Sequence, residues 1–191
     1  MIRRVWGKAG LGKFILLFGL TLLFGLGERT GAQNSLPMHL LTVLNDQYYV
    51  TFAVLPVILF LCAGEMEDDT PLVLVRYGTY GRYFFKKWLE LSVTAALFWL
   101  GQMAALLFSG IGLSIAGSWT EAAGSQWQEV FLLLERHFPS MWAAILGCAG
   151  QMLLGYCLIV LTSLFLGHFC SRSMAVKLLM ALYLFAAIWI K

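Results

Sequence analysis

The chain has 191 residues, of which 60% are hydrophobic and only 12% charged, and its formal net charge is +3 at pH 7. Soluble domains are about 45–50% apolar and about 25% charged, so this composition excludes an ordinary soluble globular protein. Lipid can cover the apolar surface that a soluble fold could not bury. Because little length is left for a soluble part, we expect residues 1–191 to form a single transmembrane domain.

Five segments are long and apolar enough to be membrane-spanning helices, which need about 20 mostly apolar residues. Helices are required because lipid offers the backbone no hydrogen-bond partners. The first segment follows a basic start and is interpreted as a retained signal anchor, in which Lys13 snorkels to the inner interface. Pro56 predicts a kink in the second segment. The predicted spans are residues 11–26, 48–64, 88–116, 141–167 and 174–190.

The distribution of basic residues predicts an orientation. Most of the 13 lysines and arginines fall in the amino-terminal segment, between the second and third spans, and between the fourth and fifth spans. The positive-inside rule therefore predicts a cytoplasmic amino terminus in a multi-pass protein. We expect a bacterial plasma membrane. Five spans put the carboxyl terminus outside, and a sixth span stays open as an alternative.

Two further helices are predicted outside the membrane. Residues 36–44 are apolar but too short to span, so they form an interfacial helix or a re-entrant segment. Between the third and fourth spans, four apolar residues repeat at helical spacing and Pro139 follows them. This pattern predicts an outer amphipathic helix that lies on the membrane surface or caps the bundle. Its apolar residues are Trp127, Phe131, Leu134 and Phe138.

The cytoplasmic loop over residues 65–88 has the most distinctive pattern. Acidic residues open it, and Thr70 with Pro71 forms a good helix start. The pattern predicts a short apolar helix over residues 71–77, ended by Gly78, and a second helix that Thr79 begins and that runs into the third span. The short helix lies on lipid, tucks under the bundle, or docks into a groove of a cytoplasmic partner.

This loop resembles the first cytoplasmic loop of ATP-binding-cassette exporter permeases of the type-two class. In that family the loop follows the second of six spans and carries a coupling helix that docks on the nucleotide-binding subunit. Glu65 or Glu67 corresponds to the acidic start and residues 72–75 to the coupling helix. Residues 78–82 correspond to the turn, and Lys86 or Lys87 to the closing lysine.

The resemblance implies a membrane-spanning permease subunit of an ATP-driven exporter. A separate cytoplasmic ATPase would bind ATP and magnesium, and this chain would bind no cofactor. A second permease copy or a related permease chain, together with membrane lipid, completes the expected partners, and no nucleic acid is expected. The alternative is a non-catalytic scaffold or accessory subunit of a larger membrane complex. The residues expected to couple to the ATPase are Glu67, Leu72, Leu74, Arg76 and Arg82.

Few polar residues lie deep in the predicted spans. Gln102 and Gln151 are the deep polar side chains, and each either forms an interhelical hydrogen bond or faces a substrate pathway. The four cysteines and three histidines show no metal-ligand spacing, and we expect the cysteines to be free thiols. Without a catalytic set or a phosphate-binding glycine loop, the chain is not expected to be an enzyme.

Overall fold

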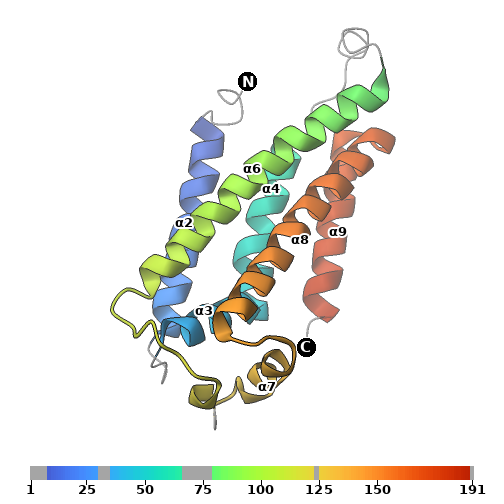
Figure 1. The fold of residues 1–191 in the computed structure, drawn as a ribbon. Helices are drawn as coiled ribbons and strands as arrows, with labels where there is room; N and C mark the ends of the chain where they lie inside the picture. Colours follow the sequence, from blue (N-terminus) through green and yellow to red (C-terminus); the bar gives the residue numbers. More distant parts are fainter. Residues whose placement is uncertain (1–7, 30–34, 66–78, 123–124, 190–191) are drawn as a thin grey trace.

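The computed structural model describes residues 8–29, 35–65, 79–122 and 125–189, and in these ranges it contains helices, loops and one isolated backbone bridge between Ser35 and Ser114. Figure 1 shows the long helices side by side, with α3 and α7 at the lower end of the bundle. The all-helical prediction is confirmed for these residues. The elements are α2 (Lys8–Glu28), α3 (Leu36–Asn45), the π-helical turn η1 (Tyr49–Val54), α4 (Leu55–Glu65), α6 (Tyr80–Ser109), the 3-10 turn η2 (Trp119–Ala122), α7 (Gln128–His137), α8 (Met141–Phe169) and α9 (Arg172–Trp189).

Three of the described helices are long and apolar enough to cross a membrane, namely α2 over Gly10–Glu28, α6 and α8. A fourth candidate is the pair formed by α3 and the η1–α4 segment, whose two parts meet at 64°. Helix α9 is a shorter apolar helix over its described residues Ser173–Phe185. The described part of the chain therefore holds three or four helices that could span a bilayer, and the count of five spans is not confirmed.

The third predicted span, residues 88–116, corresponds to α6 with both boundaries shifted. Thr79 occupies the N-cap position with extended backbone, which confirms that it begins a helix leading into this span. The predicted end is wrong because two glycines stop the helix. The N–H of Gly110 bonds back to carbonyls of the last turn, and Gly112 has φ of +92°. A left-handed residue of this kind reverses the chain at low cost only when it is glycine.

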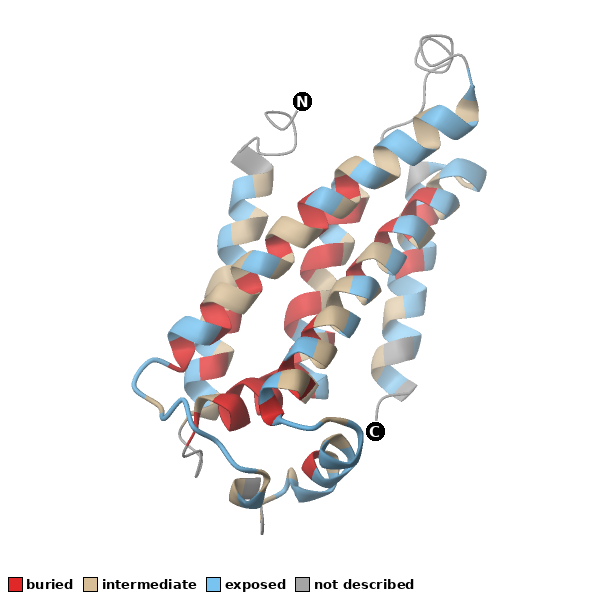
Figure 2. Ribbon diagram, in the orientation of Figure 1, coloured by how far each residue is buried: buried red, intermediate tan, exposed pale blue. Residues whose placement is uncertain are grey.

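Helix α3 is the most deeply buried element of the fold. Residues 37–44 are all buried, and α3 packs against α2, α6 and α8 across the lower end of the bundle (Figures 1 and 2). The hydroxyl of Thr42 is satisfied by the Met38 carbonyl at 2.9 Å. A helix lying flat on lipid would leave one face open. Of the two predicted arrangements, this burial favours a re-entrant segment.

The chain departs from regular α-helix twice between α3 and α4. The 64° bend falls between Asn45 and Tyr49, where the Asp46 carboxylate accepts the Tyr49 N–H at 2.9 Å. The π-helical turn η1 follows and ends at Leu55, whose N–H bonds five residues back to Val50. Pro56 comes next and has no N–H to offer. The sequence predicts a kink at Pro56, but the sharp bend of the structure lies earlier, between Asn45 and Tyr49, and a π-helical turn precedes Pro56.

The predicted amphipathic helix is present as α7. Phe131 is buried, and its ring meets Trp119 of η2 edge-on with centroids 6.3 Å apart. Trp127, Leu134 and Phe138 pack partly buried against the core, while Glu129 and Glu135 are exposed. Because α7 contacts both η2 and α8, it caps the lower end of the bundle.

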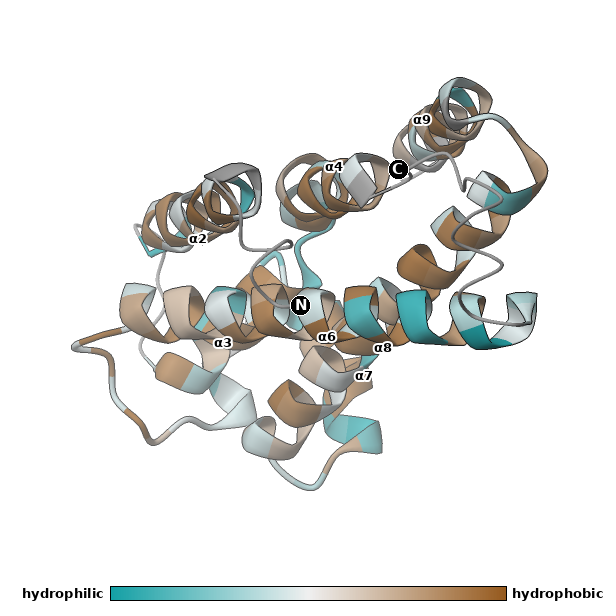
Figure 3. Ribbon diagram, turned by 90° about the horizontal axis from the view of Figure 1, so that it is seen from above, coloured by the Kyte–Doolittle hydropathy of each residue, from teal (hydrophilic) through white to brown (hydrophobic). Residues whose placement is uncertain are grey.

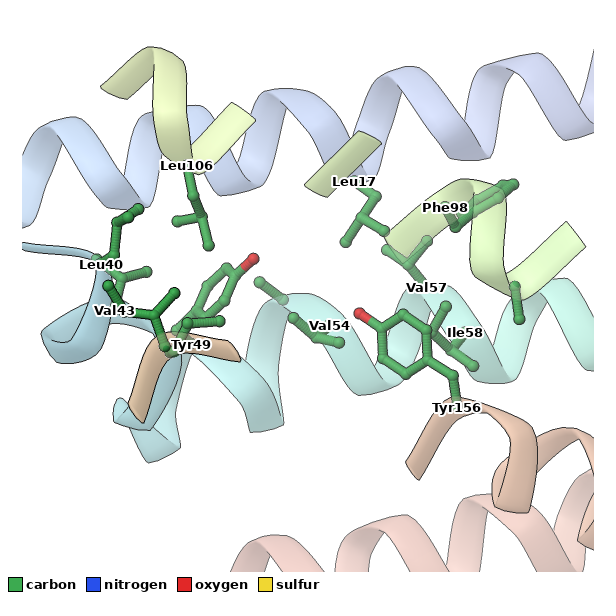
Figure 4. Close-up of a cluster of buried hydrophobic side chains, with 14 of the residues drawn as sticks. Leu17, Leu40, Val43, Tyr49, Val54, Val57, Ile58, Phe98, Leu106 and Tyr156 are labelled. Atoms are coloured by element: carbon green, nitrogen blue, oxygen red, sulfur yellow. The ribbon is translucent and has the colours of Figure 1, made fainter. Parts of the chain in front are cut away.

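The core lies where α2, α3, α4, α6 and α8 meet. Figure 4 shows Leu17, Val54, Ile58 and Phe98 converging there, and each is at most 3% exposed. Outside this core the helices are largely apolar, and Figure 3 shows hydrophilic residues on parts of α6 and α7. On α2, for example, Leu23 is 68% exposed. Apolar residues on outward faces are expected where lipid is the solvent.

Gly25 is required where α2 meets α6. A Cβ at Gly25 would lie 2.8 Å from the Cβ of Ser109, whereas a Cβ at Gly19 meets nothing within 4 Å. Gly25→Ala should therefore lower the free energy of unfolding by about 1–3 kcal/mol through overpacking. Gly19→Ala, the matched control, should raise it by up to about 1 kcal/mol through helix propensity. Unfolding of both variants in detergent tests this, and equal stabilities would contradict the packing argument.

Candidate functional site

Four helical elements join polar side chains in a hydrogen-bonded network at the centre of the core. The hydroxyls of Thr21 in α2 and Tyr49 in η1 lie 2.8 Å apart. The Gln102 amide of α6 donates to the Tyr49 hydroxyl at 2.6 Å, and the Tyr156 hydroxyl of α8 donates to the Gln102 carbonyl. All four side chains are at most 2% exposed. Figure 4 shows the two tyrosines pointing inward among the aliphatic side chains.

The network satisfies its own members. The Gln102 amide nitrogen also donates to the Met152 sulfur at 3.3 Å, and the Gln102 amide oxygen accepts from the Tyr156 hydroxyl. Because the Tyr49 hydroxyl accepts from Gln102, its single proton remains for Thr21. A polar group that is fully paired in this way stabilises helix contacts in lipid and has little capacity left for a ligand.

A second polar cluster lies at the lower end of the bundle. His39 of α3 and Ser109 of α6 are both 0% exposed, and His39 Nε2 lies 2.8 Å from Ser109 Oγ. Ser109 Oγ donates to the Leu106 carbonyl at 2.7 Å, so His39 must be the donor to the serine. An activated serine would instead give its proton to the histidine. The pair therefore ties α3 to α6 and is not arranged as a nucleophile and its base.

Arg29 completes this cluster by binding the last turn of α6. Its guanidinium Nη1 donates to the Ser109 carbonyl at 3.3 Å. A cation at the carboxyl end of a helix is favourable because the unpaired carbonyls there carry partial negative charge.

Lys13 ties α2 to α4 at the upper end of the bundle. Its ammonium donates to the Phe60 carbonyl at 3.0 Å. Gly64 leaves the room for this contact, because a Cβ there would lie 2.7 Å from Lys13 Nζ. Sequence reasoning predicted only that Lys13 snorkels. In the structure its charge sits at the last turn of α4, just before residues 66–78.

The predicted site residues fall in different places. Glu67, Leu72, Leu74 and Arg76, together with the short helix predicted over residues 71–77, lie outside the described residues. Arg82 is exposed in the first turn of α6.

The structure does not bring the two predicted pathway glutamines together. Gln102 is fully buried and bonded to two tyrosines, whereas Gln151 is exposed on α8. The hydrogen bonds of Gln102 to Tyr49 and Tyr156 agree with the alternative in which the glutamine forms interhelical hydrogen bonds. A role in a substrate pathway stays a prediction for both residues.

Sequence reasoning missed most members of both polar clusters. Tyr156 offered a signal, because its hydroxyl falls in the middle of the long apolar run of the fourth predicted span. Tyr49 fell at the edge of a predicted span and was indistinguishable from an interfacial aromatic residue. His39 was placed outside in a short helix, with nothing local to indicate its burial against Ser109.

The described residues contain no group of three or more metal-ligating side chains. Cys62 is buried, and Cys148, Cys157 and Cys170 are half-buried free thiols, in agreement with the prediction. The apolar helices long enough to span a bilayer indicate an α-helical membrane protein. No protein family model matches the chain, and no curated protein or solved structure shows significant similarity to it.

Tyr156→Phe tests the network with minimal change of shape. Removing the hydroxyl leaves the Gln102 carbonyl without its partner, and the free energy of unfolding should fall by about 0.6 kcal/mol, the average within membrane bundles, and by no more than about 1.7 kcal/mol. Tyr48→Phe is the matched control, because Tyr48 is 71% exposed and its hydroxyl bonds to no described residue. Unfolding in detergent should separate the two variants, and an equal effect would argue against the network.

Proposed function

We propose that this chain is the membrane-spanning permease subunit of an ATP-driven exporter of the ATP-binding-cassette type, coupled to a separate cytoplasmic ATPase. The observation that carries the proposal is the position of residues 66–78 in the chain. Helix α4 ends and α6 begins at the end of the bundle where α2 begins (Figure 1), and residues 66–78 stand between these two helices in the sequence. Their sequence, with an acidic start, an apolar stretch and a basic end, resembles the coupling loop of that family.

The course of the chain supports five spans with a cytoplasmic amino terminus. In Figure 1, α2, α4, α6, α8 and α9 run alternately down and up the bundle. Lys13, Arg82, Lys86 and Lys87 lie at the upper end with the amino terminus, whereas Arg136 lies on α7 at the lower end. By the positive-inside rule the upper end faces the cytoplasm. We propose a bacterial plasma membrane as the location.

Helix α6 is suited to transmit a movement of the loop to the core. It is unbroken for 30 residues and carries Gln102 in its second half. Its first turns are held to the end of α8, where the Tyr80 ring lies 4.1 Å from the His168 ring. The Lys87 ammonium bonds the Tyr83 hydroxyl at 3.0 Å. An ATPase that binds the helix predicted over residues 71–77 would thus act on the start of α6, which would pass the displacement to the buried network.

A non-catalytic scaffold or accessory subunit is the second candidate. It is favoured by the state of Gln102, whose amide is fully paired within the bundle. A pathway lined by polar groups would leave some of them open toward the passage. The two candidates differ in the partner they require, since only the permease needs an ATPase.

Leu74→Asp is the direct test of coupling. A carboxylate in the apolar helix predicted over residues 71–77 should abolish co-purification of a nucleotide-binding ATPase in a mild-detergent pull-down, while the chain stays in the membrane fraction. Leu133→Asp is the matched control, because Leu133 is 56% exposed on α7 at the opposite end. It should retain the ATPase. Normal recovery of the ATPase with Leu74→Asp would contradict the proposal, and recovery of membrane proteins alone with the unmodified chain would favour the scaffold.

Cysteine labelling tests the orientation. Gln126→Cys, in the exposed loop before α7, should react with a membrane-impermeant maleimide in intact cells. Thr79→Cys and Ser171→Cys, both exposed at the upper end, should react only after permeabilisation. The unmodified chain with its four cysteines sets the background. Labelling of Thr79→Cys in intact cells would reverse the proposed orientation.

A further inference from the structure

Gln151 is an amide on the outward face of a membrane helix. It is exposed on α8, and its side chain makes no hydrogen bond in the part of the chain that the structure describes. No other asparagine or glutamine described on α2, α4, α6, α8 or α9 is exposed. Figure 2 shows exposed residues recurring along α8, and apart from Gln151 those in the middle of the helix are apolar.

The depth of Gln151 makes this exposure costly. Gln151 lies ten residues after the start of α8 at Met141, and eighteen residues follow it to Phe169. At 1.5 Å per residue it is about 15 Å from one helix end and about 27 Å from the other. Helix α8 is thus about 12 Å longer than a hydrocarbon core of about 30 Å, and with the core centred on the helix Gln151 lies about 9 Å inside the nearer interface, farther than a glutamine side chain reaches. An unpaired amide inside the hydrocarbon core has no water with which to form hydrogen bonds, and this costs free energy.

The surroundings of Gln151 allow another helix to approach closely. A Cβ built at Gly155, one turn further along the same face, meets nothing within 4 Å. Leu154 and Leu158 flank it and are 70% and 64% exposed. The opposite face of α8 holds Tyr156 and Val160 in the core. Gln151, Leu154, Gly155 and Leu158 therefore form one outward strip, which we term the Gln151 strip.

We propose that the Gln151 strip is the contact surface for a second copy of this chain. An amide both donates and accepts, so two Gln151 side chains related by a two-fold axis satisfy each other with two symmetric hydrogen bonds. Lipid tails offer neither a hydrogen-bond donor nor an acceptor. A small residue one turn away, Gly155, lets the two α8 helices come close enough for these bonds to form. The inference rests on the exposed amide and holds for a permease and for a scaffold.

Energy transfer between labelled copies tests the proposal in lipid vesicles. The full chain, carrying either a donor or an acceptor fluorophore, is diluted with increasing lipid. Gln151→Leu should weaken self-association by about tenfold, about threefold for each of two membrane hydrogen bonds. Gly155→Leu should also weaken it, although it makes the strip more apolar. Gly19→Leu on α2 is the matched control, since a Cβ there also meets nothing within 4 Å, and it should associate normally.

Cross-linking in native membranes provides a second readout that does not depend on refolding into vesicles. Leu158→Cys should form a disulfide-linked dimer on oxidation. Leu23→Cys, which is similarly exposed at 68% on α2, should stay at the level of the unmodified chain.

Unchanged association of Gln151→Leu, or no concentration-dependent energy transfer with the unmodified chain, would overturn the proposal. A dimer from Leu23→Cys but not from Leu158→Cys would do the same. Loss of the ATPase in pull-downs bears only on the proposed function, so failure of one proposal is distinguishable from failure of the other.

Discussion

The structure depends on one constraint, which is that polar groups inside a lipid-covered bundle must find partners within the protein. The Gln102 amide meets this constraint with Tyr49 and Tyr156 and so links α6 to η1 and α8. Thr21 extends the link to α2 through Tyr49. Between helices that are largely apolar, such bonds specify which faces meet, because packing of aliphatic side chains alone distinguishes poorly among rotations.

The same constraint explains how the chain tolerates a broken helix between α3 and α4. A 64° bend and a π-helical turn leave backbone groups outside the regular ladder. The Asp46 carboxylate accepts a hydrogen bond from one of these backbone groups, the Tyr49 N–H. The turn η1 packs against α2 and α3 with Tyr49 and Val54 buried, so one face of the irregular backbone lies against protein. Tyr48 and Phe52 of this segment point outward and are exposed. Irregular backbone at membrane depth is tolerated in this setting.

Local features were predictable from the sequence, whereas helix rotation was not. The amphipathic pattern predicted α7, and Thr79 marked the start of α6, because caps and polar faces are local signals. Gln102 and Gln151 have similar apolar surroundings in the sequence, yet one is buried and the other exposed. In a soluble helix a polar face would reveal the rotation. A lipid-facing helix is apolar inside and outside, so only three-dimensional packing separates these two residues.

Each hydrogen bond of the network contributes a modest free energy of its own. A hydrogen bond within a membrane bundle contributes about 0.6 kcal/mol on average, because polar groups also find partners in the unfolded state within the membrane. Helix α6 carries both the aromatic and basic turns next to residues 66–78 and the central amide of the network. The position of α6 therefore matters more to the arrangement than the strength of any single bond, because one helix joins η1, α8 and, through Tyr49, α2. Several modest hydrogen bonds that share one helix specify how the bundle packs where aliphatic contacts alone would not.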